Sequence, residues 1–262
     1  MDGILHWKGY DWMNGQSWGV AHPDRKYVWY ADANETIVRN TSIFIGEEEG
    51  EYLMQGINNI PKYFENIGQT KWFGCGCVST YQSFHFGDFH FEYVLPNGIH
   101  LWPAIWLSGF RTWPPEIDIM EAWSGNGYFC KDKPNYRRLP LMNNIHPGIY
   151  YTKEGEKVYN KSYGSLGSDR ATFSWLQKQD AWNTCDLIWR KDLIEVYYNG
   201  HRVMRITDKD EDQGFRMLDF MDQEMYICID CFAGNNFTQD DFQYYVKHGT
   251  YFVVKDFVYK PV

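Results

Sequence analysis

Three carboxylates in the stretch PPEIDIMEAW have a spacing that suits acid–base chemistry. Successive side chains of a β-strand point to opposite faces, so Glu116 and Asp118 share one face. Strict alternation would send Glu121 to the apolar face, where a buried unpaired carboxylate is costly. A β-bulge at residues 119–120 returns Glu121 to the face of the other two. The sequence therefore predicts a bulged strand with three carboxylates on one face.

Two glutamates on one face suit retaining glycoside hydrolysis, which needs a nucleophile and an acid/base with carboxyl groups about 5 to 5.5 Å apart. Counting the bulge as one step leaves on the order of 13 Å between the Cα atoms of Glu116 and Glu121, so the side chains must lean inward. Asp118 between them is placed to hydrogen-bond the nucleophile, and its negative charge would favour a proton on a neighbouring acid. Two other interpretations stay open: a strand edge with solvated acids, and a calcium site built from oxygen ligands.

The segment TYQSFHFGDFHFEYVLPNGIHLWPAIWLSG, residues 80–109, precedes these carboxylates, and together they resemble glycoside hydrolase family 16. The matching features are Trp102-Pro103-Ala104, Trp106 and the three carboxylates. The segments WNTCDLIWRKDLIEVYYNGHRV and FVVKDFVYK resemble later strands of the family, so the resemblance extends along the chain. Pro115 stands where many β-glucanases of the family have glycine, which leaves the substrate open.

The resemblance implies an all-β fold, a jelly-roll β-sandwich of two curved antiparallel sheets with a concave substrate cleft. It also implies a retaining endo-β-glycosidase with Glu116 as nucleophile, Glu121 as acid/base and Asp118 as the residue that orients the nucleophile. The polymer is left open among β-1,3-glucan, mixed-linkage glucan and algal or host galactans. We expect no cofactor and no metal. A lectin-like sandwich that binds sugars without cutting them is the alternative, although it needs no paired glutamates.

Aromatic residues are abundant, with 12 Trp, 20 Tyr and 17 Phe, and rings of this kind offer flat apolar surfaces for sugars. Trp102 and Trp106 share one strand face, and the bulge would bring Trp123 to the carboxylate face. We predict that these three tryptophans contribute to substrate binding. His146 lies where the family often places a histidine near its cleft, and a structural histidine is an equally good interpretation.

The length of 262 residues suits one catalytic β-sandwich domain over residues 1–262. A formal charge of −9 argues against a nucleic-acid partner, which would require a basic face. No apolar run reaches the length of a membrane helix, and the first ten residues lack the regions of a signal peptide. Because polysaccharides are too large to enter cells intact, we expect a secreted or periplasmic monomer whose signal peptide is absent from this chain.

Six cysteines are too few for a disulfide scaffold in a chain of this length. The pairs Cys75-Gly-Cys77 and Cys228-Ile-Asp-Cys231 leave zinc as a minor alternative. Packing as small hydrophobic residues is the commoner role of such cysteines in strands.

Strand patterns recur along the chain. We predict strands at 27–30, 36–45, 71–79 and 83–94, the last with Phe84 on the face opposite Phe89 and a bend at Gly87. A meander follows at residues 185–206, with turns at 190–192 and at Asn199-Gly200. Trp7 and Trp12 are expected to anchor N-terminal loops more often than to line a cleft. No long segment has the period of a helix.

Overall fold

The computed structural model describes most of the chain, and the segments between the described ranges are not discussed. The described ranges are 4–15, 28–30, 42–45, 52–65, 68–96, 100–111, 113–122, 141–146, 149–151, 157–159, 163–164, 181–212, 215–234, 237–248 and 251–262.

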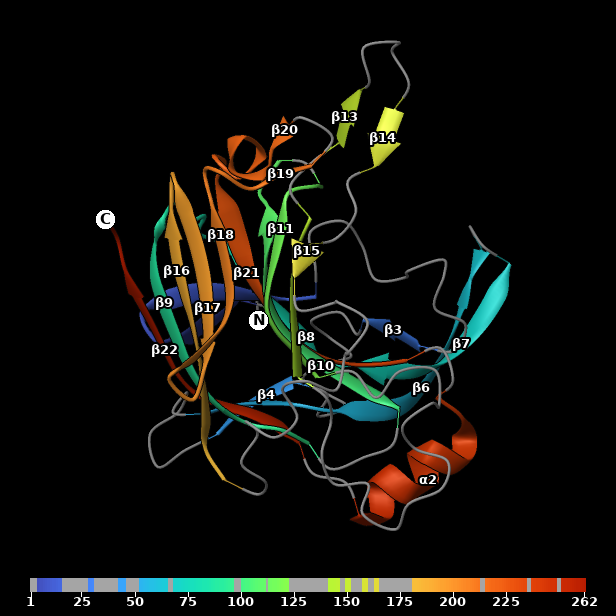
Figure 1. Ribbon diagram of the computed structural model, residues 1–262. Helices are drawn as coiled ribbons and strands as arrows, with labels where there is room; N and C mark the ends of the chain where they lie inside the picture. Colours follow the sequence, from blue (N-terminus) through green and yellow to red (C-terminus); the bar gives the residue numbers. More distant parts are fainter. Residues whose placement is uncertain are drawn as a thin grey trace.

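Two antiparallel sheets form the body of the molecule (Figure 1). The eight-stranded sheet has the order β1 (Ile4–Trp7), β2 (Tyr10–Asn14), β8 (Cys77–Thr80), β21 (Met225–Ala233), β10 (Leu101–Gly109), β11 (Glu116–Ala122), β12 (Leu141–His146), β15 (Tyr163–Gly164). The seven-stranded sheet has the order β18 (His201–Thr207), β17 (Leu193–Tyr198), β16 (Asn183–Arg190), β9 (Gly87–Val94), β22 (Phe252–Lys260), β5 (Tyr52–Gln55), β4 (Ser42–Ile45).

Smaller elements surround these sheets. A three-stranded sheet has the order β3 (Val28–Tyr30), β7 (Gln69–Cys75), β6 (Ile57–Phe64), and its β3–β7 pair is parallel. Two short pairs are β13 (Ile149–Tyr151) with β14 (Lys157–Tyr159), and β19 (Glu211–Asp212) with β20 (Phe215–Arg216). Among the described residues, the helical segments are η3 (Met217–Phe220) and α2 (Gln239–His248). Across the described ranges, no helix has both the length and the apolar character that crossing a membrane requires.

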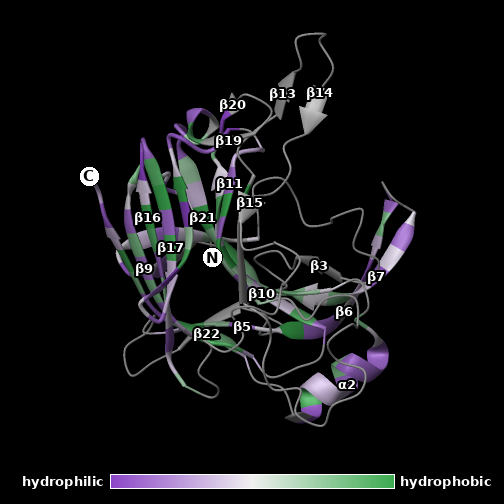
Figure 2. Cartoon of the chain, viewed as in Figure 1, coloured by the Kyte–Doolittle hydropathy of each residue, from purple (hydrophilic) through white to green (hydrophobic). Residues whose placement is uncertain are grey.

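The main core lies between the two large sheets. In the seven-stranded sheet, buried and more exposed residues alternate along the central strands, whereas β21 of the eight-stranded sheet is buried along its whole length. Strands β9 and β16 both show strict alternation, and Figure 2 shows it as alternating hydrophobic and hydrophilic bands. The buried positions of these two strands join Ile105 and Leu107 of β10 and Ile117 of β11 in one apolar cluster. Burial of this area is the main stabilising contribution to the fold. The predicted all-β jelly-roll sandwich is therefore confirmed.

A second apolar cluster packs α2 against one end of the eight-stranded sheet. Phe242 and Tyr245 of α2 contact a group that includes Phe73 of β7 and Phe232 of β21. Trp102 packs against this cluster. The sequence analysis did not anticipate the ten-residue helix, which turns Phe242 and Tyr245, three positions apart, to this cluster.

Several strand predictions are confirmed. The short strand at 28–30 is present, and the meander has its predicted turns, with Asn199 at φ 49° and Gly200 at φ 77°. Trp7 and Trp12 are buried in the core, so the anchoring role is confirmed for both. The prediction for 36–45 is met at 42–45, and its remainder lies outside the described residues.

Two strand predictions were wrong in part. Residues 71–79 form two strands that belong to different sheets and are separated at Gly76. The strand predicted from residue 83 begins only at Gly87, whose φ of 142° redirects the chain, and a Cβ there would lie 2.4 Å from the Tyr259 ring. Phe84 precedes this bend, so the parity of the strand does not apply to it, and its ring packs against Phe89 in the core.

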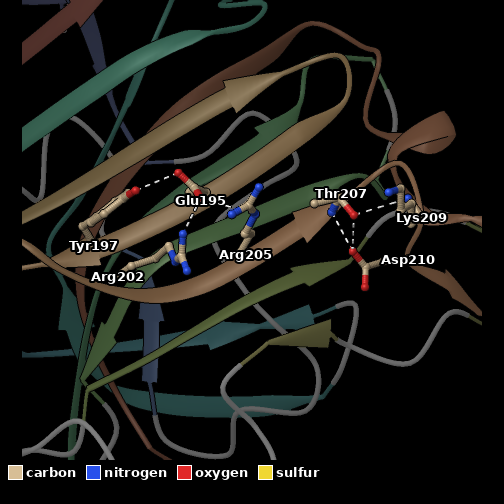
Figure 3. Close-up of polar contacts among 7 residues, drawn as sticks. All are labelled: Glu195, Tyr197, Arg202, Arg205, Thr207, Lys209 and Asp210. Atoms are coloured by element: carbon tan, nitrogen blue, oxygen red, sulfur yellow. Dashed lines mark hydrogen bonds and ion pairs between the residues drawn. The ribbon is translucent and has the colours of Figure 1, made fainter.

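The face of the seven-stranded sheet turned away from the core, here the outer face, holds its carboxylates in ion pairs. Glu195 is only 7% exposed and accepts hydrogen bonds from Tyr197 Oη (2.7 Å) and Arg202 Nη1 (3.0 Å), while Arg205 Nε lies 3.6 Å away (Figure 3). Thr207 and Asp210 close the turn that follows β18. Two of the partners of Glu195 are therefore arginines, which carry full positive charges.

Candidate active site

The predicted bulge is present in β11 and sets the spacing of the three carboxylates. In the register with β10, Glu116 lies opposite Ser108, Asp118 opposite Trp106, and Glu121 opposite Ala104. The irregularity falls where Met120 pairs with Ile105 and Ile119 is the extra residue. The three acids are unevenly spaced along β11, but their partners on β10 lie two residues apart.

The same geometry sends the intervening residues to the core. Ile117, Ile119, Met120 and Ala122 all belong to the main apolar cluster. The three acids consequently share the face of the eight-stranded sheet turned away from the core, here called the carboxylate face. The two glutamates lie four strand steps apart, on the order of 13 Å between Cα atoms, as the alternation predicted.

Indole N–H groups hold the glutamate side chains. Trp102 Nε1 donates to Glu121 Oε1 at 2.8 Å, and Trp113 Nε1 donates to Glu116 Oε2 at 2.8 Å. Each indole is a neutral donor, so it fixes an oxygen in place without adding a full positive charge. The two glutamates are thus oriented by the same kind of contact from opposite ends of the face.

Asp118 has an altered protonation equilibrium. Burial, followed by the negative charge of Glu121, raises the pKa of Asp118 well above its usual value; a hydrogen bond with Glu116 opposes part of the rise and Asp230 adds to it. The sequence analysis expected Asp118 to supply negative charge. That expectation stays a prediction, although desolvation disfavours the ionised form of a buried carboxyl group.

A fourth carboxylate joins the site, and the sequence analysis missed it. Asp230 of β21 is 2% exposed and accepts a hydrogen bond from Trp106 Nε1 at 2.8 Å. It pairs with Ala104, the residue that also faces Glu121 from the other side. Its only signal in the sequence is an acidic residue inside the apolar run MYICIDCFA, and nothing local connects that run to residues more than a hundred positions earlier.

The predicted sugar-binding aromatics are placed as follows. Trp102 and Trp106 both lie on the carboxylate face, and Trp106 is buried in a small cluster with Ala104, Tyr226 and Cys228. Trp113, which is 52% exposed, was not predicted, although its place three residues before Glu116 could have indicated it. Trp123 lies outside the described residues.

His146 is placed through its backbone. It pairs with Glu116 in the register of β11 with β12, so it lies on the strand next to the proposed nucleophile. Its role in substrate binding stays a prediction.

The donor set of the site fits acid–base chemistry better than calcium binding. Calcium prefers several ionised carboxylates, whereas the burial that raises the pKa of Asp118 disfavours its ionised form. Among the described residues, no group of three or more His, Cys, Asp or Glu could hold a metal ion. The cysteines of the zinc alternative are divided between surfaces, since Cys228 lies in the small cluster beside Trp106 and Cys231 in the main core. The five described cysteines are buried free thiols.

Comparisons with known proteins agree with this arrangement. The family model described as glycosyl hydrolases family 16 matches residues 62–248. Glucan endo-1,3-beta-glucosidase A1 of Niallia circulans is 22% identical over 177 residues, which cover 62% of this chain and 22% of that relative. The chain thus spans about a fifth of that relative's length.

Two solved structures show the same fold. The catalytic domain of an endo-1,3-beta-glucanase (laminarinase) from Thermotoga petrophila RKU-1 has a TM-score of 0.61 at 16% identity, covering 99% of this chain and 94% of that one. LamA from Z. galactanivorans was solved in complex with laminaritriose and laminaritetraose. It has a TM-score of 0.60 at 16% identity, and the match covers 95% of this chain and 92% of that one.

Proposed function

Because this chain belongs to glycosyl hydrolases family 16, we propose that it is a retaining endo-β-glycosidase that hydrolyses internal bonds of a β-linked polysaccharide. The single observation that carries the proposal is the register of β11. It places Glu116, Asp118 and Glu121 opposite alternate residues of β10, so the three acids share one face of the sheet. A retaining mechanism requires two carboxyl groups that converge on one glycosidic bond. The bulge brings both glutamates to one face of the sheet with Asp118 between them, and this arrangement supports the proposal.

In the first step, Glu116 attacks the anomeric carbon while Glu121 gives its proton to the leaving oxygen. The Trp113 indole orients the attacking carboxylate, and Trp102 orients the acid. We propose that Asp118, the more buried partner of its hydrogen-bonded pair, holds Glu116 in position for the attack. A side chain that hydrogen-bonds the nucleophile fixes the direction of its attacking oxygen.

In the second step, a water molecule cleaves the glycosyl-enzyme ester. The negative charge of Glu116 is lost in the ester, and Glu121, now ionised, takes a proton from the water. The attack on the opposite face of the anomeric carbon restores the β configuration. Both carboxylates are thereby returned to their starting states.

β-1,3-Glucan is the first polymer to test, because the relatives named above are described as acting on it or as binding its oligosaccharides. Mixed-linkage glucan and β-linked galactans follow. The exposed ring of Trp113 beside Glu116 suits an open groove that admits an internal stretch of polymer. We further propose that residues 1–262 act as one catalytic domain, as a monomer, outside the cytoplasm where intact polysaccharides occur.

The test is a panel of soluble polysaccharides incubated with the wild-type protein and with Glu116→Ser. Reducing ends and product sizes are measured over time. We expect one polymer to yield a ladder of oligosaccharides with the wild type and none with the variant. Binding without cleavage by the wild type across the panel would instead support the lectin-like alternative.

A further inference from the structure

Asp230 occupies a place in the site that the two-glutamate reaction does not require. It is a carboxylate on the central strand β21, 2% exposed, within an otherwise apolar run. Burying a carboxylate costs free energy that its hydrogen bonds must offset. An apolar residue of similar volume would occupy the position without that cost, so stability of the sandwich alone does not account for an acid there.

The register of three strands shows what lies around Asp230. Ala104 of β10 pairs with Glu121 on one side and with Asp230 on the other. The two acids therefore flank a single methyl group, with about 9 to 10 Å between their Cα atoms at the usual strand spacing. A small residue in the middle leaves room above it for a larger group from a neighbouring row.

Trp106 fills that room. Its own row contains Asp118 and Cys228, yet its indole N–H reaches into the next row and donates to Asp230 Oδ2 at 2.8 Å. Trp106 and Ala104 belong to the same buried cluster. The indole therefore leans along the sheet toward the row of Ala104 and Asp230.

We propose that Asp230 is a positioning residue for the reaction: it fixes the Trp106 indole across Ala104, so that the ring forms a rigid floor under the sugar beside Glu121. This inference rests on the proposed function, because it assigns Trp106 to the substrate surface of the same site. Without this hydrogen bond, the Trp106 indole could adopt other rotamers, in which the ring would not lie flat under the sugar. A carboxylate acceptor selects one of them, since charge-assisted hydrogen bonds are shorter and stronger than neutral ones.

The test compares Asp230→Asn, Asp230→Leu, Trp106→Phe and the Asp230→Leu/Trp106→Phe double variant. Asparagine keeps an oxygen acceptor for the indole, whereas leucine removes it at similar volume. We expect Asp230→Leu to lower kcat/KM on the order of 10²-fold, because small misplacements at a reacting centre have effects of that size. Asp230→Asn should stay within about fivefold of wild type, because a neutral acceptor still satisfies the donor.

Because Asp230 acts through Trp106, the double variant should be no worse than the poorer single variant, whereas independent contributions would multiply. Additive losses, or equal losses in the asparagine and leucine variants, would overturn the proposal. Glu195→Gln is the matched control: it changes a buried carboxylate on the outer face and should leave kcat/KM at the wild-type value.

A second measurement does not depend on activity. The indole N–H resonance of Trp106 is assigned as the one that Trp106→Phe deletes from a spectrum of ¹⁵N-tryptophan-labelled protein. We expect it to move upfield in Asp230→Leu and to stay close to its wild-type position in Asp230→Asn. A resonance that Asp230→Leu leaves in place would overturn the positioning role. If the wild type cuts no polymer, the proposed function fails by itself, and this spectrum still decides whether Asp230 holds the ring.

Discussion

Both large sheets carry buried or half-buried carboxylates on the face turned away from the core, but these carboxylates have different partners. On the outer face, guanidinium groups contact Glu195 and an imidazole contacts Asp186 (Figure 3 shows the Glu195 group). On the carboxylate face, indole N–H groups donate to Glu116, Glu121 and Asp230.

The difference explains how the same residue type serves two purposes. A guanidinium partner favours the ionised form of a carboxylate at every ordinary pH, which suits a structural contact. A neutral indole donor orients the oxygen and still allows the group to gain or lose a proton. An acid/base must change its protonation state in each catalytic cycle, so the indole is the more suitable partner.

The largest effect is expected when Glu121 on the carboxylate face is given an arginine partner, the kind of partner that Glu195 has on the outer face. In Trp102→Arg, the guanidinium would pair with Glu121 and hold it ionised, so kcat/KM on polysaccharide should fall on the order of 10²- to 10⁴-fold, the usual contribution of general acid catalysis. Trp102→Phe is the control, because it removes the donor without adding charge. An aryl glycoside with a good leaving group needs little acid assistance, so the difference in kcat/KM between the two variants should be smaller on that substrate. Equal activity of both variants on polysaccharide would contradict this account.

A smaller effect is expected from Asp118. Asp118→Asn retains a hydrogen-bonding side chain beside Glu116 and should lose no more than about tenfold in kcat, whereas Asp118→Ala removes that side chain and should lose about 10²-fold. If Asp118 acted as an anion, the two variants would be equally impaired. Steady-state kinetics of both variants at the wild-type pH optimum separates these outcomes.

The same residue should affect stability with a defined sign. Its folded-state pKa is raised, so its favourable contribution is complete below the unfolded-state value near 4 and is lost as the pH rises through the folded-state value. We therefore expect the wild type to lose stability toward alkaline pH relative to Asp118→Asn. Urea unfolding midpoints measured from pH 4 to pH 9 test this, and parallel curves for the two proteins would refute the assignment.

On the outer face, Glu195→Ala should reduce stability and leave catalysis unchanged. The substitution removes the acceptor of Tyr197 and Arg202, and hydrogen bonds to charged groups contribute about 1.5 to 3 kcal/mol each. Partial exposure of the arginine lowers this, so we expect a loss of about 1 to 2 kcal/mol in the free energy of unfolding. A change in kcat/KM beyond about twofold would show that the two faces are coupled.

The smallest effect is expected at His90. The hydrogen bond with Asp186 raises the pKa of His90, and partial burial opposes that rise. The stabilisation is therefore complete below the unfolded value near pH 6.5 and is lost as the pH rises through the folded value. His90→Gln should flatten this part of the stability profile by less than about 1 kcal/mol, because the pair is about one-third exposed. If the free energy of unfolding of His90→Gln changed with pH as steeply as that of the wild type, the His90–Asp186 pair would be excluded as the source of this pH dependence.

The bulge and the alignment of the three acids were predictable because they follow from a local rule. Side-chain alternation has a period of two, and one acid out of phase in an apolar strand leaves few alternatives to an extra residue. The meander was predictable for the same reason, since Asn199-Gly200 specifies its own turn.

What escaped prediction depends on contacts between distant segments. Asp230 joins the site only because β21 lies next to β10, and sequence order does not reveal strand order. The raised pKa of Asp118 depends on how deeply the side chain is buried, which a strand pattern does not give. The helix α2 is held by tertiary packing of Phe242 and Tyr245. In each case the deciding interaction is non-local.

The central claim is that Glu116 and Glu121 act by double displacement on one glycosidic bond. The most direct test follows the anomeric proton of fresh product by ¹H NMR during the first minutes of polysaccharide digestion, before mutarotation equilibrates the anomers. We predict that the β-anomer appears first and the α-anomer only later. An α-anomer that appears first would show single displacement with inversion and would contradict the mechanism derived from this site.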